Sequence, residues 1–375
     1  MKIAEITALP VAYQEPNDAG GTRHLLFVRM RTDDGLTGWG EAVTMWPEAT
    51  IATASIVDGL APLLLGHDPA EHAALHRSLR QHSWWYGDGG IAAFAISALD
   101  IALWDLAGQA AGVNVVDLIG GVAQETLPVL VSCHAMSSDL DEMAATMAGW
   151  VKQHNATGIK VGFGKRGAAD LGRSAARDVA FVRALRRELG SRPAIMTDLG
   201  ASIHWDVRTA ISRTLAFEEF GIAWIEEPLG ADDPSGYAEL RSRTRTRIAY
   251  GEREWTPRGV QRIVGSGTVD VVGIDPGRCE GMTGWLAAAA HVGAAGREVN
   301  AHAWSSVVTT AASIALSLAT PHCHQFEVKP LENPMQHELP VTPIATASGT
   351  VGALTSPGLG IEIDESALSR YAVPR

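Results

Sequence analysis

Eight short apolar runs, each followed by a polar amphipathic segment, occupy the chain from about residue 127 to residue 328. A strand that is buried on both faces has an unbroken apolar sequence, and such runs alternating with helices are typical of a parallel sheet. Eight of them predict a closed (β/α)8 barrel. The expected strands are residues 127–133, 158–163, 194–197, 222–225, 247–251, 269–274, 298–301 and 324–328.

Each of the last six runs ends at an ionisable residue. The differences between the residue numbers are 28, 26, 23, 27 and 25, close to one strand-helix unit at every step. Active sites of such barrels lie at the carboxyl ends of the strands, so six functional groups are expected at one mouth. They are Asp198, Glu226, Glu252, Asp275, His302 and Glu327.

The first three of these residues predict a metal site. Asp198, Glu226 and Glu252 would repel one another at one mouth unless a cation neutralised them. Ligands that are all oxygen suit Mg²⁺ better than zinc. Each acid taken alone could instead cap the helix that follows its strand. The regular spacing of all three favours the metal site.

The first third of the chain has a different pattern. Residues 2–8, 24–31 and 37–44 are expected as strands with turns between them, and residues 49–81 and 90–112 as helical. We therefore predict an α/β protein: a modified TIM (β/α)8 barrel over residues 126–340 with an α+β N-terminal capping domain over residues 1–125. The tail, residues 341–375, is expected to complete the capping domain.

Composition excludes several classes of function. The net charge of −12 would repel nucleic acid and anionic membrane surfaces. Three widely separated cysteines form neither a disulfide framework nor a four-ligand zinc site, and no run of about 18 strongly apolar residues is expected to span a membrane. We expect a cytoplasmic homo-oligomer whose partner is a small carboxylate. The cysteines are Cys133, Cys279 and Cys323.

Four segments carry a resemblance to a known family. Residues 96–108 read ISALDIALWDLAG, residues 118–121 read LIGG, residues 224–228 read WIEEP, and residues 274–284 read IDPGRCEGMTG. Together they resemble the enolase superfamily, in the branch that contains mandelate racemase and the acid-sugar dehydratases. The resemblance extends from about residue 20 to about residue 340.

The resemblance implies roles for the residues at the mouth. It implies that Asp275 and His302 form a general-base pair and that Glu327 helps to stabilise an enolate oxygen. Lys160 matches the first lysine of the family's Lys-x-Lys motif, which implies contact with the substrate carboxylate. Lys160 has an alternative interpretation as an inward-facing barrel lysine paired with the surrounding acids. The implied Mg²⁺ ligands are Asp198, Glu226 and Glu252.

The sequence departs from the family pattern in two places. Gly162 stands where the second lysine of Lys-x-Lys is expected, so we predict that the second strand supplies no base. Gly200 stands where family members commonly have asparagine, two residues after the metal-binding Asp198. Lys160 is then the only cation that we expect beside the metal.

The resulting functional hypothesis is proton abstraction next to a carboxylate. His302 is suited to take such a proton near neutral pH, and Asp275 would fix its tautomer. The predicted enzyme is a Mg²⁺-dependent dehydratase that converts an aldonate or aldarate through an enediolate to a 2-keto-3-deoxy acid. The alternatives are a racemase, epimerase or cycloisomerase of a carboxylate, and a barrel that binds a carboxylate without turnover.

Two further features give weaker predictions. Substrate specificity is expected to reside in the capping loops at residues 14–24 and 43–49. His72 and His76 have the spacing of a helical metal pair, but the glutamate of a zinc-protease motif is missing between them. An ordinary surface helix is the preferred interpretation of that segment.

Overall fold

The computed structural model describes residues 1–87, 89–200, 202–346 and 348–375. Eight parallel strands lie in the order β10-β9-β8-β7-β6-β5-β4-β11, and a parallel bridge between Val299 and Cys323 spans the seam between β10 and β11. The predicted barrel is confirmed, and every predicted run ends within two residues of an observed strand end. The strands are β4 (Thr126–His134), β5 (Gly158–Phe163), β6 (Ala194–Leu199), β7 (Ile222–Glu226), β8 (Arg247–Tyr250), β9 (Val271–Ile274), β10 (Glu298–Ala301) and β11 (Phe326–Val328).

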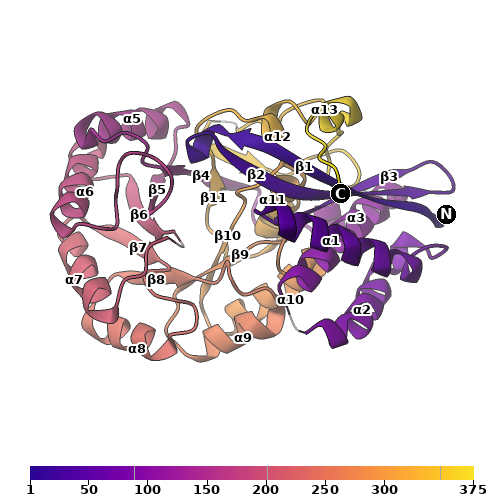
Figure 1. Cartoon of the computed structure of the whole chain (residues 1–375), viewed down its shortest axis with the longest axis horizontal. Coiled ribbons are helices and arrows are strands. Elements are labelled where there is room, and N and C mark those ends of the chain that lie inside the picture. Colours follow the sequence, from indigo (N-terminus) through magenta and orange to yellow (C-terminus); the bar gives the residue numbers. More distant parts are fainter. Residues whose placement is uncertain (88, 201, 347) are drawn as a thin grey trace.

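Helices follow the strands around the outside of the barrel (Figure 1). One set of strand side chains, from Leu130, Met196, Trp224, Ala249 and Val271, fills the interior as a small apolar cluster. Side chains of the opposite set pack outward against the helices in the main core. Burial on both faces explains why the strand sequences are unbroken apolar runs. The helices are α5 (Leu140–Gln153), α6 (Ala175–Leu189), α7 (Val207–Glu218), α8 (Pro234–Arg243), α9 (Pro257–Gly265), α10 (Gly281–Ala294) and α11 (Val307–Ala319).

The N-terminal domain is an antiparallel sheet in the order β1-β2-β3 packed against helices. The first two strands are longer than expected, and β1 continues through Pro10 to Glu15. A proline is tolerated there because β1 is an edge strand, where a missing N–H does not interrupt the sheet. The elements are β1 (Ile3–Glu15), β2 (Gly21–Thr32), β3 (Thr37–Ala42), α1 (Pro47–Leu60), α2 (His72–Ser83), α3 (Ile91–Ala111) and α4 (Val115–Ile119).

Helix α3 is the buried centre of the capping domain. By length and composition its 21 residues could cross a membrane, although Asp100 and Asp105 interrupt its apolar sequence. Its apolar window is nevertheless 89% buried inside the molecule. The helix also contacts the barrel, where Trp104 Nε1 donates to Thr283 Oγ1 at 2.9 Å. A helix covered on all sides is apolar all round, which accounts for its hydropathy.

Helix α2 is the surface helix that its sequence suggested, but its two histidines lie on the side that packs inward. His76 is buried, and its Nε2 lies 3.8 Å from Oε2 of Glu280, a residue that directly precedes α10. The His72 ring packs on Trp104 with ring centres 4.1 Å apart. The two histidines therefore help to join the capping domain to the barrel.

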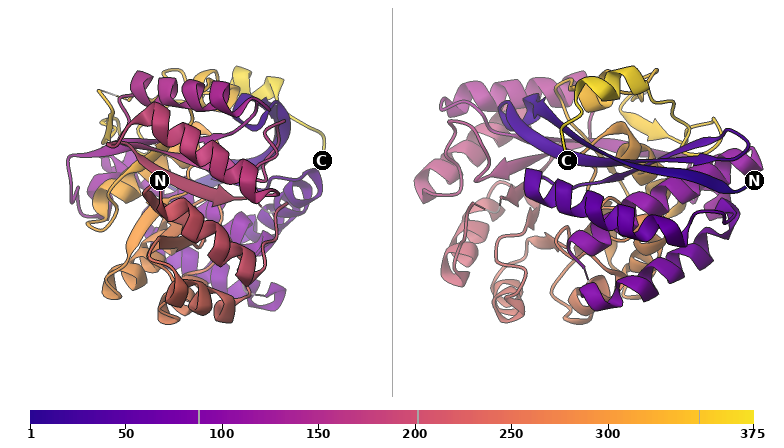
Figure 2. Two further views of the ribbon diagram at one scale, coloured as in Figure 1. Left: turned by 90° about the vertical axis from the view of Figure 1, so that its left-hand side faces the viewer. Right: turned by 45° about the vertical axis from the view of Figure 1, so that its right-hand side comes forward.

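The C-terminal tail contacts both domains. It contains α12 (Pro334–His337), β12 (Thr350–Gly352) and α13 (Glu365–Arg370). Strand β12 pairs antiparallel with β4 of the barrel. Glu365 forms ion pairs with Arg29 at 2.6 Å and Arg31 at 3.1 Å, both on β2. In Figure 2 this yellow tail lies against the indigo sheet.

Candidate active site

The ends of β6, β7 and β8 present three acids that no helix uses as a cap. Asp198 and Glu226 are register partners at the ends of β6 and β7, and Glu252 follows β8 closely. The helices after these strands are capped by other side chains. Asp206 caps α7, Asp233 caps α8 and Thr256 caps α9. The three acids therefore do not serve as helix caps.

Lys160 lies between two carboxylates. Its Nζ is 3.0 Å from Glu226 Oε2 and 2.7 Å from Glu327 Oε1. Asn300 also donates a hydrogen bond to Glu327. Burial by itself would lower the pKa of Lys160, but Glu226 and Glu327 together raise that pKa well above its ordinary value. Lys160 is thus held as an ammonium group at the floor of the mouth.

His302 lies between two acids on the other side of the mouth. Its Nδ1 is 2.7 Å from Asp275 Oδ2, and its Nε2 is 3.2 Å from Glu252 Oε2. Asp275 is held in turn by the Gly277 N–H, which donates to Oδ1 at 2.8 Å. A carboxylate at Nδ1 places the ring proton there and directs Nε2 toward the mouth. All the predicted strand-end residues therefore lie in one connected region.

Two acids in this region have strongly shifted pKa values. Burial raises the pKa of Glu226 to about 7, and the neighbouring Asp198 and Glu327 add to this effect while Lys160 opposes it. Burial acts in the same direction on Glu252, but His302 and Arg278 outweigh it and lower the pKa of Glu252. Burial is therefore the main cause of the raised pKa of Glu226, and the strongest charge effect on it, from Lys160, acts in the opposite direction.

The donor set fits a divalent cation. Within the described ranges, no three His, Cys, Asp or Glu side chains are gathered closely enough to hold a metal ion. The acid oxygens instead contact cationic groups: Asp198 pairs with Lys165 at 3.3 Å, Glu226 with Lys160 and Glu252 with His302. Three buried carboxylates on adjacent strand ends are nonetheless the oxygen ligands that Mg²⁺ prefers.

The mouth encloses a cavity of about 70 Å³. Lys160 was the only cation expected here, and that expectation was wrong, because Lys165, Arg278 and Arg23 also line the cavity. Arg278 lies inside the IDPGRCEGMTG segment, so the family resemblance of that segment could have pointed to it. Lys165 follows the end of β5, and no pattern marks it. The other lining residues are Met45, Ser132, Cys133, His134, Asp198, Glu252, His302 and Trp304.

The capping domain reaches the mouth through its loops. Asp18 Oδ1 lies 3.1 Å from His134 Nδ1 at the end of β4, which ties the loop between β1 and β2 to the barrel. Arg23 donates to Met45 Sδ at 3.3 Å and so joins the two capping loops. On β3, Glu41 accepts hydrogen bonds from the Ser306 and Thr309 N–H groups, which fixes the segment just after His302.

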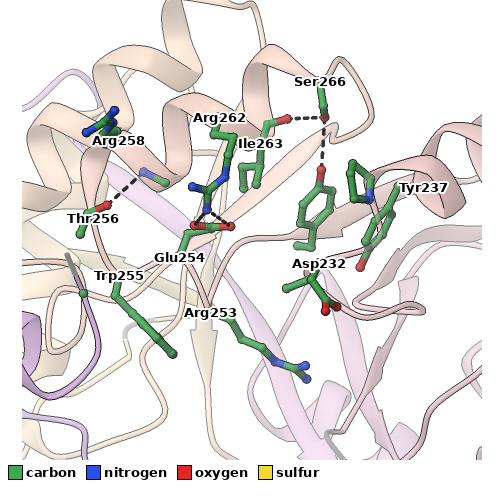
Figure 3. A pocket seen from close by; sticks show the side chains of 15 residues that line it. Asp232, Tyr237, Arg253, Glu254, Trp255, Thr256, Arg258, Arg262, Ile263 and Ser266 are labelled. Atoms are coloured by element: carbon green, nitrogen blue, oxygen red, sulfur yellow. Dashed lines mark hydrogen bonds and ion pairs between the residues drawn. The ribbon is translucent and has the colours of Figure 1, made fainter. Parts of the chain in front are cut away.

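A larger cavity of about 690 Å³ lies elsewhere, between α8, α9 and the segments that follow β7 and β8 (Figure 3). None of the predicted site residues lines it. Arg253 on its wall pairs with Glu227 at 2.8 Å, and Arg262 pairs with Glu254 at 3.0 Å. Of the predicted site residues, the smaller cavity is lined by Lys160, Asp198, Glu252 and His302, while Glu327 lines a separate cavity of about 120 Å³.

Two family models match the chain. The model described as mandelate racemase / muconate lactonizing enzyme, N-terminal domain, matches residues 8–120. The model described as enolase C-terminal domain-like matches residues 142–367. The two matches cover the capping domain and most of the barrel.

Individual relatives cover nearly the whole chain. A 3,6-anhydro-alpha-L-galactonate cycloisomerase from Streptomyces coelicolor is 31% identical over 93% of this chain and 91% of its own. A D-galactarolactone cycloisomerase from Agrobacterium fabrum is 27% identical over 94% and 92%. A D-gluconate dehydratase from Thermoproteus tenax is 27% identical over 96% and 72%. The crystal structure of a racemase from Streptomyces coelicolor with bound magnesium has a TM-score of 0.87 at 28% identity, covering 99% of this chain and 100% of that one.

Proposed function

Because the chain belongs to the mandelate racemase and muconate lactonizing enzyme family of the enolase superfamily, we propose that it is a Mg²⁺-dependent acid-sugar dehydratase. Its substrate is an aldonate or aldarate, and its product is a 2-keto-3-deoxy acid. The relatives named above include both a dehydratase and cycloisomerases of sugar acids or their derivatives. Both reactions begin with removal of the proton next to a carboxylate.

The observation that carries the proposal is the contact between His302 and Asp275. Asp275 Oδ2 lies 2.7 Å from His302 Nδ1 and accepts its proton in a hydrogen bond. His302 Nε2 can therefore accept the α-proton of a substrate in the mouth. Lys160 and Glu327 lie at the floor, where the ammonium group attracts the substrate carboxylate. As the proton leaves, the carboxylate becomes an enediolate with more negative charge, and the nearby ammonium stabilises it.

Asp198, Glu226 and Glu252 would hold the metal. When bound, Mg²⁺ supplies positive charge that neutralises the three acids and stabilises the developing charge on the substrate carboxylate. The magnesium bound by the racemase from Streptomyces coelicolor supports this choice of metal. Chelation is expected to abolish turnover and added Mg²⁺ to restore it; full activity in EDTA would contradict the proposal.

A screen of sugar acids tests the reaction. The panel contains D-galactonate, D-gluconate, D-galactarate and D-glucarate, each incubated in D₂O with Mg²⁺. Formation of a 2-keto acid with loss of water is expected for at least one of them. Inversion at the α-carbon without loss of water would contradict the dehydratase assignment. Failure of every acid to exchange its α-proton would indicate a barrel without catalysis.

Cycloisomerisation is the second candidate, because two of the named relatives carry that activity. It uses the same α-proton abstraction, but the β-oxygen that leaves belongs to a ring, so the product has the mass of the substrate. D-Galactarolactone is the matching probe. Turnover of the lactone without a change in mass, with no turnover of the open-chain acids, would favour this candidate.

The carboxylate is expected to be the anchor of the substrate. Lys160 and the metal provide positive charge at the floor of an acid-rich mouth, so an uncharged ester loses the attraction that a carboxylate has. We expect the methyl ester of an accepted acid to show no turnover. Retained turnover of the ester would show that another group holds the substrate.

Glu252→Gln tests the metal site itself. The change keeps the size of the side chain and removes the charge, so Mg²⁺ affinity should fall by tenfold or more and most activity should be lost. Calorimetric titration with Mg²⁺ measures the affinity, and circular dichroism checks the fold. Glu254→Gln is the matched control, because Glu254 pairs with Arg262 in the larger cavity. Equal Mg²⁺ affinity in both variants would exclude Glu252 as a ligand.

A further inference from the structure

Two glycines make room for a lysine side chain at the mouth. A Cβ at Gly162 on β5 would lie 2.6 Å from Lys165 Cγ and 2.7 Å from His134 Cδ2. A Cβ at Gly200, just after β6, would lie 2.8 Å from Lys165 Cδ and 3.1 Å from its Cε. The aliphatic part of Lys165 thus runs through space that side chains at 162 and 200 would otherwise occupy.

The backbone turns sharply to bring Lys165 there. Gly164 has a φ of +67°, in the left-handed region that glycine adopts readily. Its N–H donates to the Leu171 carbonyl at 2.9 Å, which fixes the turn. A Cβ at Gly164 would lie 2.0 Å from Ile203 Cγ1, so the turn is also packed. Lys165 therefore points back toward the strand ends although it lies beyond β5.

The ammonium group of Lys165 ends in the mouth cavity. It lies 3.3 Å from Asp198 Oδ2 and lines the cavity together with Glu252 and His302. Within the described part of the chain it makes this one ion pair, whereas Lys160 makes two.

The mouth consequently has groups able to transfer protons on two sides. His302 follows β10, and Lys165 follows β5, with β11 and β4 between them in the barrel. Dehydration needs two proton transfers, one from the α-carbon and one to the departing hydroxyl. When the proton and the hydroxyl leave from opposite faces of the substrate, His302 alone cannot perform both transfers.

We propose that Lys165 is the catalytic acid that protonates the departing β-hydroxyl, on the side of the substrate away from His302. This inference rests on the proposed dehydratase function. At Gly162 the sequence lacks the lysine that the family motif has there. The space left by that missing side chain is filled by Lys165 from the following loop.

The step balances without a further reactant. His302 Nε2 takes the α-proton, and the electron pair of that C–H bond moves onto the carboxylate to give the enediolate. That pair then returns to form a double bond between the α- and β-carbons. The C–O bond at the β-carbon breaks with its electron pair, and a proton from Lys165 Nζ joins the hydroxyl to give water. The enol then takes up a proton from solvent at the β-carbon, releases its O–H proton to solvent and becomes the 2-keto acid. Exchange with solvent returns His302 and Lys165 to their starting states.

Lys165→Met separates the two proton transfers. The variant is assayed in D₂O on each acid of the four-acid panel that the unmodified protein dehydrates. Dehydration is expected to fall by about 10²–10⁴-fold, the usual contribution of a general acid. Exchange of the α-proton, which His302 performs, should stay within about threefold. Recovered substrate is then expected to carry deuterium at the α-carbon, as seen by proton NMR.

Lys165→Arg distinguishes a proton donor from a positive charge. The guanidinium keeps the charge beside Asp198 but does not release its proton, so KM should hold while kcat falls as in the methionine variant. Arg173→Met is the control in the same loop, because Arg173 is exposed and pairs only with Asp170 among the described residues. That control should dehydrate at the unmodified rate.

Three results would overturn the inference. Dehydration by Lys165→Met within a few-fold of the unmodified rate would show that no proton comes from Lys165. A parallel loss of exchange and dehydration, or a loss of Mg²⁺ binding by calorimetry, would show that Lys165 acts only through Asp198. If the unmodified protein exchanges no α-proton on any acid, the proposed function itself fails and this inference falls with it.

Discussion

His302 contacts two carboxylates that act on different nitrogens. Asp275 holds Nδ1 at 2.7 Å, while Glu252 lies 3.2 Å from Nε2, the atom that faces the substrate. A cation bound by Glu252 would draw that carboxylate into its own coordination and leave Nε2 to the substrate. We therefore expect the metal to bind before the proton is transferred.

His302→Asn is expected to abolish α-proton exchange and dehydration together. Asparagine keeps a polar group near Asp275 but provides no base of suitable strength, so both activities should fall by at least about 10²-fold. Proton NMR in D₂O reports exchange and loss of water in one sample. His67→Asn, on the exposed surface, is the control. Exchange at the normal rate in His302→Asn would assign the base to another residue.

The strand-end residues could be predicted from the sequence because each ends an apolar run. The register of a parallel sheet then brings Asp198 and Glu226 to the same level. Lys165 could not be predicted this way, because its place depends on two glycines that are 38 residues apart in the chain and adjacent only in space. A side chain from a loop leaves no periodic signal.

Close contact between β3 and α3 determines the packing of the capping domain. A Cβ at Gly40 on β3 would lie 1.8 Å from the Ala98 carbonyl oxygen on α3. A backbone atom cannot move aside as a flexible side chain can, so this contact requires glycine. The helix was predictable from its apolar pattern, but its contact with the strand was not. The spacing of apolar residues predicts a helix, but it does not specify which face of that helix packs against which strand.

Gly40→Ala should therefore be strongly destabilising. We expect the free energy of unfolding to fall by about 3 kcal/mol, at the upper end for overpacked cores. Gly59→Ala, near the end of α1, is the matched substitution, because its Cβ meets open space. That change should raise stability by about 0.5–1 kcal/mol. Urea unfolding measures both, and equal stabilities would contradict the packing argument.

Asp105 on α3 makes stability depend on pH. It accepts hydrogen bonds from the Trp39 and Leu359 N–H groups, both at 2.8 Å, but burial outweighs them and raises its pKa to about 6. The folded state thus binds this proton more tightly than the unfolded chain, whose carboxyl has an ordinary pKa near 3.8. The contribution to stability is complete below about pH 4 and is lost as the pH rises to about 6.

Comparison with Asp105→Asn isolates this effect. The asparagine does not titrate, so the variant serves as the reference. Between pH 4 and pH 7, the free energy of unfolding of the unmodified protein should fall by up to about 3 kcal/mol more than that of the variant. Urea unfolding at a series of pH values gives the difference. Parallel pH profiles would show that Asp105 keeps an ordinary pKa when folded.

At the scale of the whole molecule, the two domains share one tail. Strand β12 adds to β4, while the last residues join the capping sheet through a bridge between Val11 and Ala372. The barrel was predictable because its pattern repeats eight times. The dual contacts of the tail were not, because its short elements have no period and are held by hydrogen bonds to distant strands.

Deleting residues 364–375 should lower the melting temperature by roughly 4 °C, because a buried leucine alone contributes about 1.5–3 kcal/mol. The deletion removes the buried Ala367 and Leu368 and both ion pairs of Glu365 to β2. Differential scanning calorimetry measures the change. Glu365→Gln serves as the control, because exposed ion pairs contribute little, and its melting temperature should move by only a degree or two. An unchanged melting temperature after the deletion would refute a structural role for these residues.

The position of the last residues beside the first strand has a consequence for synthesis. Ala12 donates its N–H to the Tyr371 carbonyl at 2.9 Å, and Val373 donates to Pro10 at 3.0 Å. During synthesis β1 is made long before residues 371–373, so its edge stays open until those residues have left the ribosome. Pro10, which cannot donate a hydrogen bond, stands in the middle of that edge and limits pairing with strands of other nascent chains. The capping domain is therefore completed only after the barrel beneath it has been synthesised.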